Sequence, residues 1–293
     1  MTEDYSPVWK NLMKHNLRIA FLTSEFPTEN SRSGGLGSFV ERITKCLKNQ
    51  GHHVEVFVYS LVTETVEYDG IAVHRIKTIL PFHWRIFVSL LNRLFPGPWG
   101  GAGRYITIAY GLKNAFDSRC KNISFDLVHS TNCGVSSLFF RRSRNYKHIL
   151  RMSSKRDLWF EFDRTSGFGA RLMIWLERIC VHNADVVYAP SKFVAKQVSE
   201  KWKVNTRVIR PPAYIEIEPS KDLPFDLPEK FLIHFGQIGR RKGSNLLAQA
   251  LTKAWKEEPS LKMVWAGRPI TPGDYEKCHQ MWGEKAVNVI WFP

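Results

Sequence analysis

A glycine-bearing loop between an apolar strand and an amphipathic helix, within residues 18–59, constrains the fold more than any other feature. An apolar run at 19–22 precedes a polar loop and the cluster Gly34-Gly35-Leu36-Gly37. Apolar residues then recur at helical spacing up to Gly51, and a second apolar run follows at 54–58. This order predicts a βαβ unit whose helix points free N–H groups toward the carboxyl end of the first strand. Open α/β sheets bind ligands at that edge, although a glycine-rich loop without a ligand is the plain alternative.

The same alternation of strands and helices continues to about residue 210. We expect a small β-hairpin at 63–79 with a turn at Asp69-Gly70. Further strands are expected at 125–130, 149–152, 184–190 and 206–210. Helices are expected at 105–116, 171–182 and 192–202. Strands that alternate with helices indicate an α/β fold with a parallel, doubly wound sheet.

The composition changes at 213–229, where prolines and acidic residues crowd together. We interpret 1–212 as one Rossmann-like domain, 213–229 as a linker and 230–293 as the start of a second Rossmann-like domain. In the second domain we expect strands at 231–235, 262–266 and 287–291 with one or two helices, one of them at 244–256. So few elements leave apolar surface bare, and we therefore expect the chain to be truncated within this domain.

Charge and composition exclude several classes of protein. No apolar run approaches the roughly 20 residues that span a bilayer. The five cysteines are scattered without metal-ligand spacing, which predicts reduced thiols, no metal site and a cytoplasmic setting. The formal net charge of +15 favours an anionic partner. Because the sequence holds no nucleic-acid recognition module, phosphorylated small molecules and an anionic membrane surface are the remaining candidates.

The stretch 79–103 leaves two interpretations open. Apolar and aromatic residues recur there at helical spacing with Arg85 and Arg93 between them, and the apolar face holds Trp84, Phe87, Leu91 and Phe95. The first interpretation is a helix packed on the sheet. The second is an apolar and basic surface that docks on the inner face of a membrane or receives a lipid-linked acceptor.

The most specific feature is a cationic turn at 236–243. Gly236 and Gly243 flank a loop that carries Arg240, Arg241 and Lys242, between a predicted strand and a predicted helix. Three cations beside a helix N-terminus suit a diphosphate, because guanidinium groups bind phosphate in forked geometry and lysine adds a point charge. A solvated basic turn is the alternative.

The ordered set of motifs resembles the GT-B glycosyltransferases, and among them the retaining family 4. The matching residues are Gly34-Gly35, Gly51-His52-His53-Val54, Asp126-Leu127-Val128-His129, Glu177, Ala184 to Ser191, and the turn from Gly236 to Lys242-Gly243. The resemblance covers 18–291 and implies two Rossmann-like domains, the second incomplete.

The resemblance also implies a function. A sugar would move, with retention, from a nucleotide-diphosphate sugar to a saccharide or lipid-linked acceptor, without a metal or other cofactor. Lys242 would hold the donor diphosphate with Arg240 or Arg241 nearby, since Gln237 stands at the family's arginine position. The glycine loop, with Gly34, Gly35 and Gly37, would approach the donor phosphate or the acceptor, and His129 and Asp157 are candidate catalytic contacts to sugar or acceptor.

Two other functions fit the same fold. The resemblance places the family's element with two glutamates separated by seven residues beyond residue 293, which would suit a truncated, inactive glycosyltransferase-like protein. Another GT-B enzyme that acts on nucleotide sugars, such as an epimerase, is the second alternative.

Overall fold

The computed structural model describes residues 16–29, 34–79, 82, 84–86, 89, 99–158, 167–211 and 226–292. The chain divides into two compact units. Unit 1 comprises Met1–Glu161 and Thr165–Ile215, and unit 2 comprises Phe162–Arg164 and Glu216–Pro293. Most of the predicted linker lies outside the described residues, as do Phe87, Leu91 and Phe95 of the predicted apolar helix.

Unit 1 is built on an eight-stranded sheet with the order β3-β4-β2-β1-β5-β6-β7-β8. The strands are β1 (Arg18–Thr23), β2 (His53–Ser60), β3 (Glu64–Tyr68), β4 (Ile71–Lys77), β5 (Leu127–Thr131), β6 (Lys147–Arg151), β7 (Val186–Ala189) and β8 (Thr206–Val208). All neighbours pair in parallel except β3 and β4, which form an antiparallel hairpin. The hairpin turns at Asp69 and Gly70, both with positive φ, as a two-residue turn between twisted strands requires. The predicted α/β fold with a mostly parallel sheet is confirmed.

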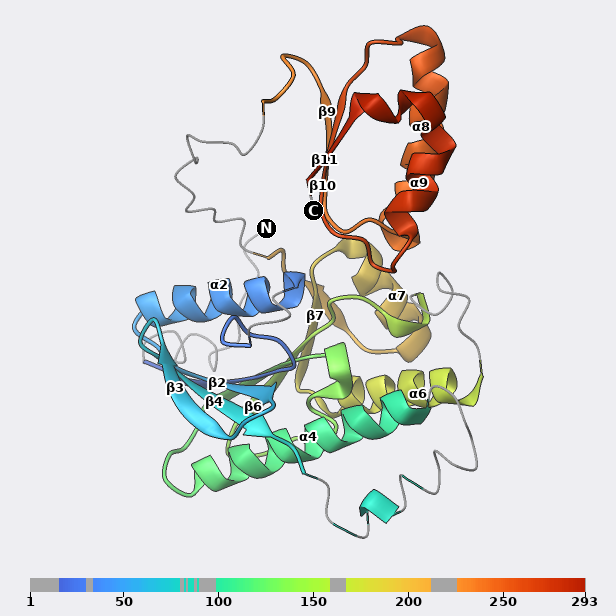
Figure 1. Cartoon of the computed structure of the whole chain (residues 1–293). Coiled ribbons are helices and arrows are strands. Elements are labelled where there is room, and N and C mark those ends of the chain that lie inside the picture. Colours follow the sequence, from blue (N-terminus) through green and yellow to red (C-terminus); the bar gives the residue numbers. More distant parts are fainter. Residues whose placement is uncertain are drawn as a thin grey trace, which may run out of the picture. The chain divides into compact units, whose positions relative to one another are not determined.

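Helices cover both faces of this sheet: α2 (Gly35–Asn49) lies on one face, and α4 (Trp99–Cys120) and α6 (Phe168–Asn183) lie on the other (Figure 1). Alternation along β1 explains the arrangement, because successive side chains point to opposite faces. Ile19 and Phe21 pack in the core beneath α2, whereas Ala20 and Leu22 pack in the core beneath α4. The side chains on both faces of β1 are therefore buried.

The helix α7 (Lys192–Trp202) follows β7 directly and begins at a capping residue. The hydroxyl of Ser191 accepts a hydrogen bond from the Val194 N–H at 3.3 Å, as serine does at a helix N-cap. The buried face of α7 joins a core that also includes residues of α6 and β7. The cap therefore fixes where the chain turns from the end of β7 into the helix.

Unit 2 has a three-stranded parallel sheet with the order β11-β10-β9. Its strands are β9 (Leu232–Phe235), β10 (Met263–Ala266) and β11 (Val289–Phe292), and its helices are α8 (Ser244–Glu257) and α9 (Asp274–Trp282). Both helices lie on the same side of the sheet (Figure 1), where Trp255, Trp265 and Trp282 form the core. The side chain of Phe235 remains 88% exposed, so the expectation of bare apolar surface in this domain is confirmed.

Candidate functional site

In unit 1 the turns that follow β1, β5, β6 and β7 meet at the carboxyl edge of the sheet, where α2 also begins. Gly34 precedes α2, and Gly35 and Gly37 lie in its first turn, which holds no acidic residue and no side-chain cap. A Cβ atom on Gly34 would lie 3.0 Å from Oε2 of Glu25, whereas one on Gly35 would meet none of the described residues within 4 Å. The glycine loop therefore leaves open space at the start of α2, where the helix dipole favours an anion.

His129 lies on β5 and faces α2. Its register partner on β1 is Phe21, whose ring centroid is 4.6 Å from the imidazole. Nε2 lies 2.8 Å from the hydroxyl of Tyr188, and Nδ1 is buried with no hydrogen-bond partner among the described residues. Burial, with the charge of Arg151 nearby, lowers the pKa of His129 to about 3. The imidazole is therefore neutral at physiological pH and can act as a hydrogen-bond donor or acceptor but not as a resident cation.

Arg151 ends β6 on the same face of the sheet and was not among the predicted site residues. Its register partner is Tyr188, its Cζ lies 3.9 Å from the ring centroid of Phe39 in α2, and it donates a hydrogen bond to the hydroxyl of Ser153. Burial lowers the pKa of Arg151 from its usual range. The sequence signal was an arginine at the end of an apolar strand, but only strand order brings it beside His129.

Asp157 lies in the turn after β6 and is held by two lysines. Its carboxylate accepts hydrogen bonds from Nζ of Lys155 and, at 3.2 Å, from Nζ of Lys201 on α7. Burial acts to raise the pKa of Asp157, but these two hydrogen bonds outweigh it and hold the pKa below its usual value. The structure therefore gives Asp157 an ion-paired environment, away from the contacts of His129, and its predicted role in substrate contact stays a prediction.

A buried glutamate on α6 organises the turn that carries these residues. Both carboxylate oxygens of Glu177 accept hydrogen bonds, one from the Asn132 side-chain amide and the other from the Arg156 N–H at 3.2 Å. The Asn132 amide also donates to the Ser154 carbonyl at 2.6 Å and accepts from the Ser153 N–H at 2.8 Å. Asn132 and Glu177 thus tie the turns after β5 and β6 to α6.

The environment of Glu177 perturbs its acidity. Burial raises the pKa of Glu177 to about 7, and the hydrogen bond from Asn132 compensates only in part. A cavity of about 20 Å³ beside the carboxyl has room for about one water molecule. A signal was present in the sequence, where Glu177 interrupts the apolar pattern of the predicted helix, but its partners are distant along the chain.

The cationic turn of unit 2 is a strand–turn–helix, as predicted. The turn η2 (Arg240–Lys242) connects β9 to α8, and the Gly239 N–H donates to the hydroxyl of Ser244 at 2.9 Å. Gly236 and Gly243 have φ values of +138° and +74°, which favour glycine at both ends of the turn.

The cations of this turn face solvent. Arg240 and Lys242 are exposed, Arg241 is half-buried, and α8 has no acidic residue in its first turn. Within the part of the chain that the structure describes, neither Arg240 nor Lys242 forms an ion pair. The turn therefore presents two unneutralised cations beside a helix N-terminus, the arrangement that binds phosphate.

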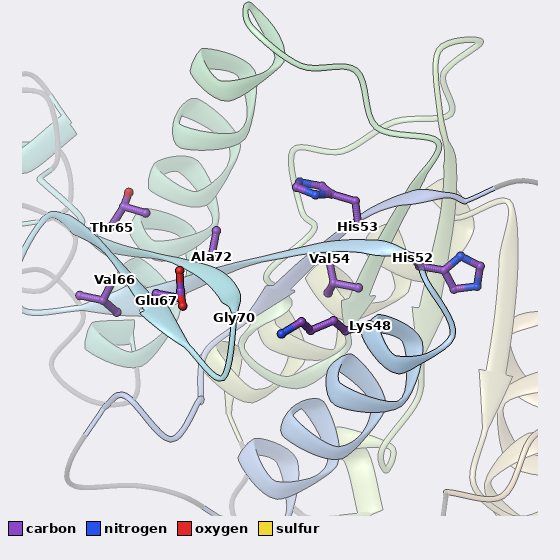
Figure 2. A pocket seen from close by; sticks show the side chains of 9 residues that line it. All are labelled: Lys48, His52, His53, Val54, Thr65, Val66, Glu67, Gly70 and Ala72. Atoms are coloured by element: carbon purple, nitrogen blue, oxygen red, sulfur yellow. The ribbon is translucent and has the colours of Figure 1, made fainter.

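A pocket of unit 1 lies elsewhere, at the amino end of β2. It has a volume of about 450 Å³ and lies between the end of α2, the start of β2 and the β3–β4 hairpin (Figure 2). Two of its polar side chains have protein partners: Lys48 donates to the Asp69 carbonyl, and His52 Nδ1 accepts from the Leu17 N–H at 3.2 Å. Open α/β sheets bind ligands at the carboxyl ends of their strands, so we place the site there and not in this pocket.

Neither a metal cluster nor a membrane span occurs in the described parts of the chain. No group of three or more His, Cys, Asp or Glu side chains among those residues could hold a metal ion. No described helix has the length and apolarity needed to cross a bilayer.

Comparison with known proteins places the chain in a family. Residues 34–212 match the model of the glycosyl transferase 4-like domain, which is more than half of the chain. A curated relative, the uncharacterized glycosyltransferase YqgM of Bacillus subtilis (strain 168), is 28% identical over 101 residues, which are 34% of this chain and 28% of that protein. The chain thus matches little more than a quarter of the length of that relative.

Solved structures share the fold at low sequence identity. A sucrose-phosphate synthase from Thermosynechococcus elongatus superposes with a TM-score of 0.62 at 16% identity, covering 94% of this chain and 70% of that one. The catalytic domain of starch synthase IV from Arabidopsis thaliana gives a TM-score of 0.60 at 12% identity, with 95% and 74% covered. WaaG, a glycosyltransferase involved in lipopolysaccharide biosynthesis, gives 0.57 at 15% identity, with 94% and 69% covered. The chain therefore has the α/β fold of the GT-B glycosyltransferases and belongs to the family of the glycosyl transferase 4-like domain.

Proposed function

We propose that the protein transfers a sugar, with retention at the anomeric carbon, from a nucleotide-diphosphate sugar to a saccharide or lipid-linked acceptor. The observation that carries the donor assignment is the turn at 240–242, where exposed cations stand beside the N-terminus of α8. Negative charge grows on the nucleoside diphosphate as the glycosidic bond breaks. Fixed cations and a helix dipole stabilise that charge without reorganising, and each well-placed donor contributes about 3 kcal/mol.

The comparison with starch synthase IV supports this choice of leaving group, since that domain was solved with ADP and acarbose bound. In the present chain Lys242 would hold the diphosphate, with Arg240 or Arg241 and the glycines Gly236 and Gly243 around it. The reaction would need no metal, so activity should persist in the presence of a chelator such as EDTA.

Titration of the full chain with UDP, GDP, ADP and their sugars tests the donor site. We expect Lys242→Ala to weaken binding of the preferred nucleotide by about 10-fold to 100-fold, the usual value of a hydrogen bond to a charged group. Lys256→Ala is the matched control, because Lys256 is an exposed lysine in the last turn of the same helix. Equal affinity of wild type and Lys242→Ala would contradict the assignment. Product analysis with a labelled donor separates a glycoside from an epimer or free sugar, and NMR of the product gives its anomeric configuration.

A membrane-bound acceptor is the second part of the proposal. Four apolar residues of the stretch 79–103 are exposed, namely Ile79, Phe82, Trp84 and Ile86. Together with a net charge of +15, they fit an anionic surface at the cytoplasmic face of a membrane. Co-sedimentation with vesicles that contain anionic lipid should exceed that with neutral vesicles, and Trp84→Glu should reduce it. No sedimentation with either vesicle would refute this part.

A further inference from the structure

We propose that the carboxyl edge of the unit 1 sheet carries a subsite for an oxyanion, a phosphate or carboxylate group of a substrate, with Arg151 and His129 as its binding residues. The inference rests on the proposed function, because it names the chemistry of one group that the enzyme recognises. It concerns unit 1 alone and does not involve the turn at 240–242.

The first observation is a buried cation without a counter-charge. Arg151 is only 7% exposed, and its guanidinium stacks on Phe39 and donates to the Ser153 hydroxyl. Among the described residues no carboxylate lies within ion-pair distance of it. A buried guanidinium has five N–H donors and is costly to leave unneutralised, so it marks a place where an anion binds.

The second observation is an unused polar atom on the adjacent strand β5, where His129 pairs in register with Ile149, two residues before Arg151. His129 is 8% exposed, and its Nδ1 has no hydrogen-bond partner in the described part of the chain. When the Tyr188 hydroxyl donates its proton to Nε2, the imidazole proton lies on Nδ1, which is then a free donor. Because the ring is neutral, it donates to an anion without adding a second buried charge beside Arg151.

The third observation is the helix that both residues approach. Phe39 of α2 lies against the Arg151 guanidinium, and its ring centroid is 6.4 Å from that of His129. The first turn of α2 has no acidic residue, and no atom of the described residues would lie within 4 Å of a Cβ at Gly35. Glu25 lies beside Gly34, but it is not an ion-pair partner of Arg151. The positive charge of a guanidinium, the donor of a neutral imidazole and the positive end of a helix dipole thus lie at one edge of the sheet.

Two sources could supply this oxyanion: an acidic acceptor, such as a sugar phosphate, or the diphosphate of the donor. The chemistry of recognition is the same for both. The experiment therefore titrates inorganic phosphate, glucose 6-phosphate and UDP separately.

The test uses the full chain carrying Lys242→Ala, so that the cationic turn of unit 2 does not bind the probe. Inorganic phosphate should raise the melting temperature of this protein and show saturable binding by calorimetry. The further change Arg151→Met keeps the stacking on Phe39 and removes the charge. We expect it to weaken phosphate binding at least 10-fold, and to leave the melting temperature without phosphate unchanged or higher. Arg207→Met, at an exposed arginine on β8, is the matched control and should leave phosphate binding unchanged.

Several outcomes decide the matter. If Arg151→Met abolishes binding of glucose 6-phosphate but not of UDP, the oxyanion belongs to the acceptor. If it abolishes binding of UDP but not of glucose 6-phosphate, the oxyanion belongs to the donor. Equal phosphate affinity with and without Arg151→Met overturns the proposal, as does the absence of phosphate binding in the Lys242→Ala protein. If Arg151→Met does not fold, His129→Phe, which removes the free donor, should reduce phosphate affinity in its place. The donor assignment is tested separately: it fails if Lys242→Ala, in a protein with Arg151 intact, leaves the affinity for UDP unchanged.

Discussion

Replacing the buried Glu177 of α6 by glutamine should make the protein more stable than wild type at basic pH and slightly less stable at acidic pH. Burial raises the pKa of Glu177 to about 7 from its usual 4.5, so the folded state favours the protonated carboxyl. Between these two pH values the unfolded chain binds fewer protons than the folded one, and stability therefore falls as pH rises. At 1.36 kcal/mol per pKa unit, the cost above pH 7 is about 3 kcal/mol.

Glu177→Gln removes this cost and loses one hydrogen bond. A glutamine side chain has one acceptor oxygen, so it cannot accept from both the Asn132 amide and the Arg156 N–H. That loss costs about 1–2 kcal/mol at every pH. We therefore expect the variant to be about 2 kcal/mol more stable than wild type at pH 8, and slightly less stable at pH 5. The difference between the two proteins should change by about 2.5 kcal/mol over this range.

Urea unfolding of both proteins at pH 5, 6, 7 and 8, followed by circular dichroism, measures this difference. Glu200→Gln is the control, because Glu200 is an exposed glutamate on the neighbouring helix α7 and should show no such pH dependence. A stability difference between wild type and Glu177→Gln that is the same at pH 5 and pH 8 would show that the carboxyl does not titrate in this range.

Three further changes test other parts of unit 1 and unit 2. Glu55 is fully buried, and hydrogen bonds from His74, Arg119 and His53 outweigh burial and lower its pKa. The stabilisation of the folded state by the ionised Glu55 carboxylate is therefore present above about pH 4.5 and is lost at lower pH. In urea titrations, Glu55→Gln should lower the free energy of unfolding by about 3–5 kcal/mol at pH 7 and by much less near pH 3. Ser191→Ala removes the cap of α7 and should cost about 1 kcal/mol, whereas Ser199→Ala inside the same helix should cost little; equal losses would argue against the cap. Trp265→Ala removes a fully buried ring from the core of unit 2 and should cost about 3–5 kcal/mol there, visible as accelerated hydrogen exchange of β9 and β11.

The local parts of the candidate site follow from residues that are close in sequence. The glycines at 34–37 and the cations at 240–242 each lie between a strand and the helix that follows it, so periodicity and turn chemistry were sufficient to predict their setting. The same holds for the Asp69–Gly70 turn of the hairpin. These features depend on a few consecutive dihedral angles and on the residue types that allow them.

The tertiary structure decided which distant residues meet. His129, Arg151 and Tyr188 lie on three successive strands and become neighbours only because β5, β6 and β7 are adjacent and in this register. A shift of one residue in β6 would turn Arg151 to the opposite face of the sheet. Asn132 likewise reaches Glu177 across 45 positions of the chain. The sequence alone predicted the strands and most of the helices, but not α9 or the start of α4 at Trp99. The charges and hydrogen bonds of unit 1 depend on strand order and register, which arise from burying both faces of the sheet together.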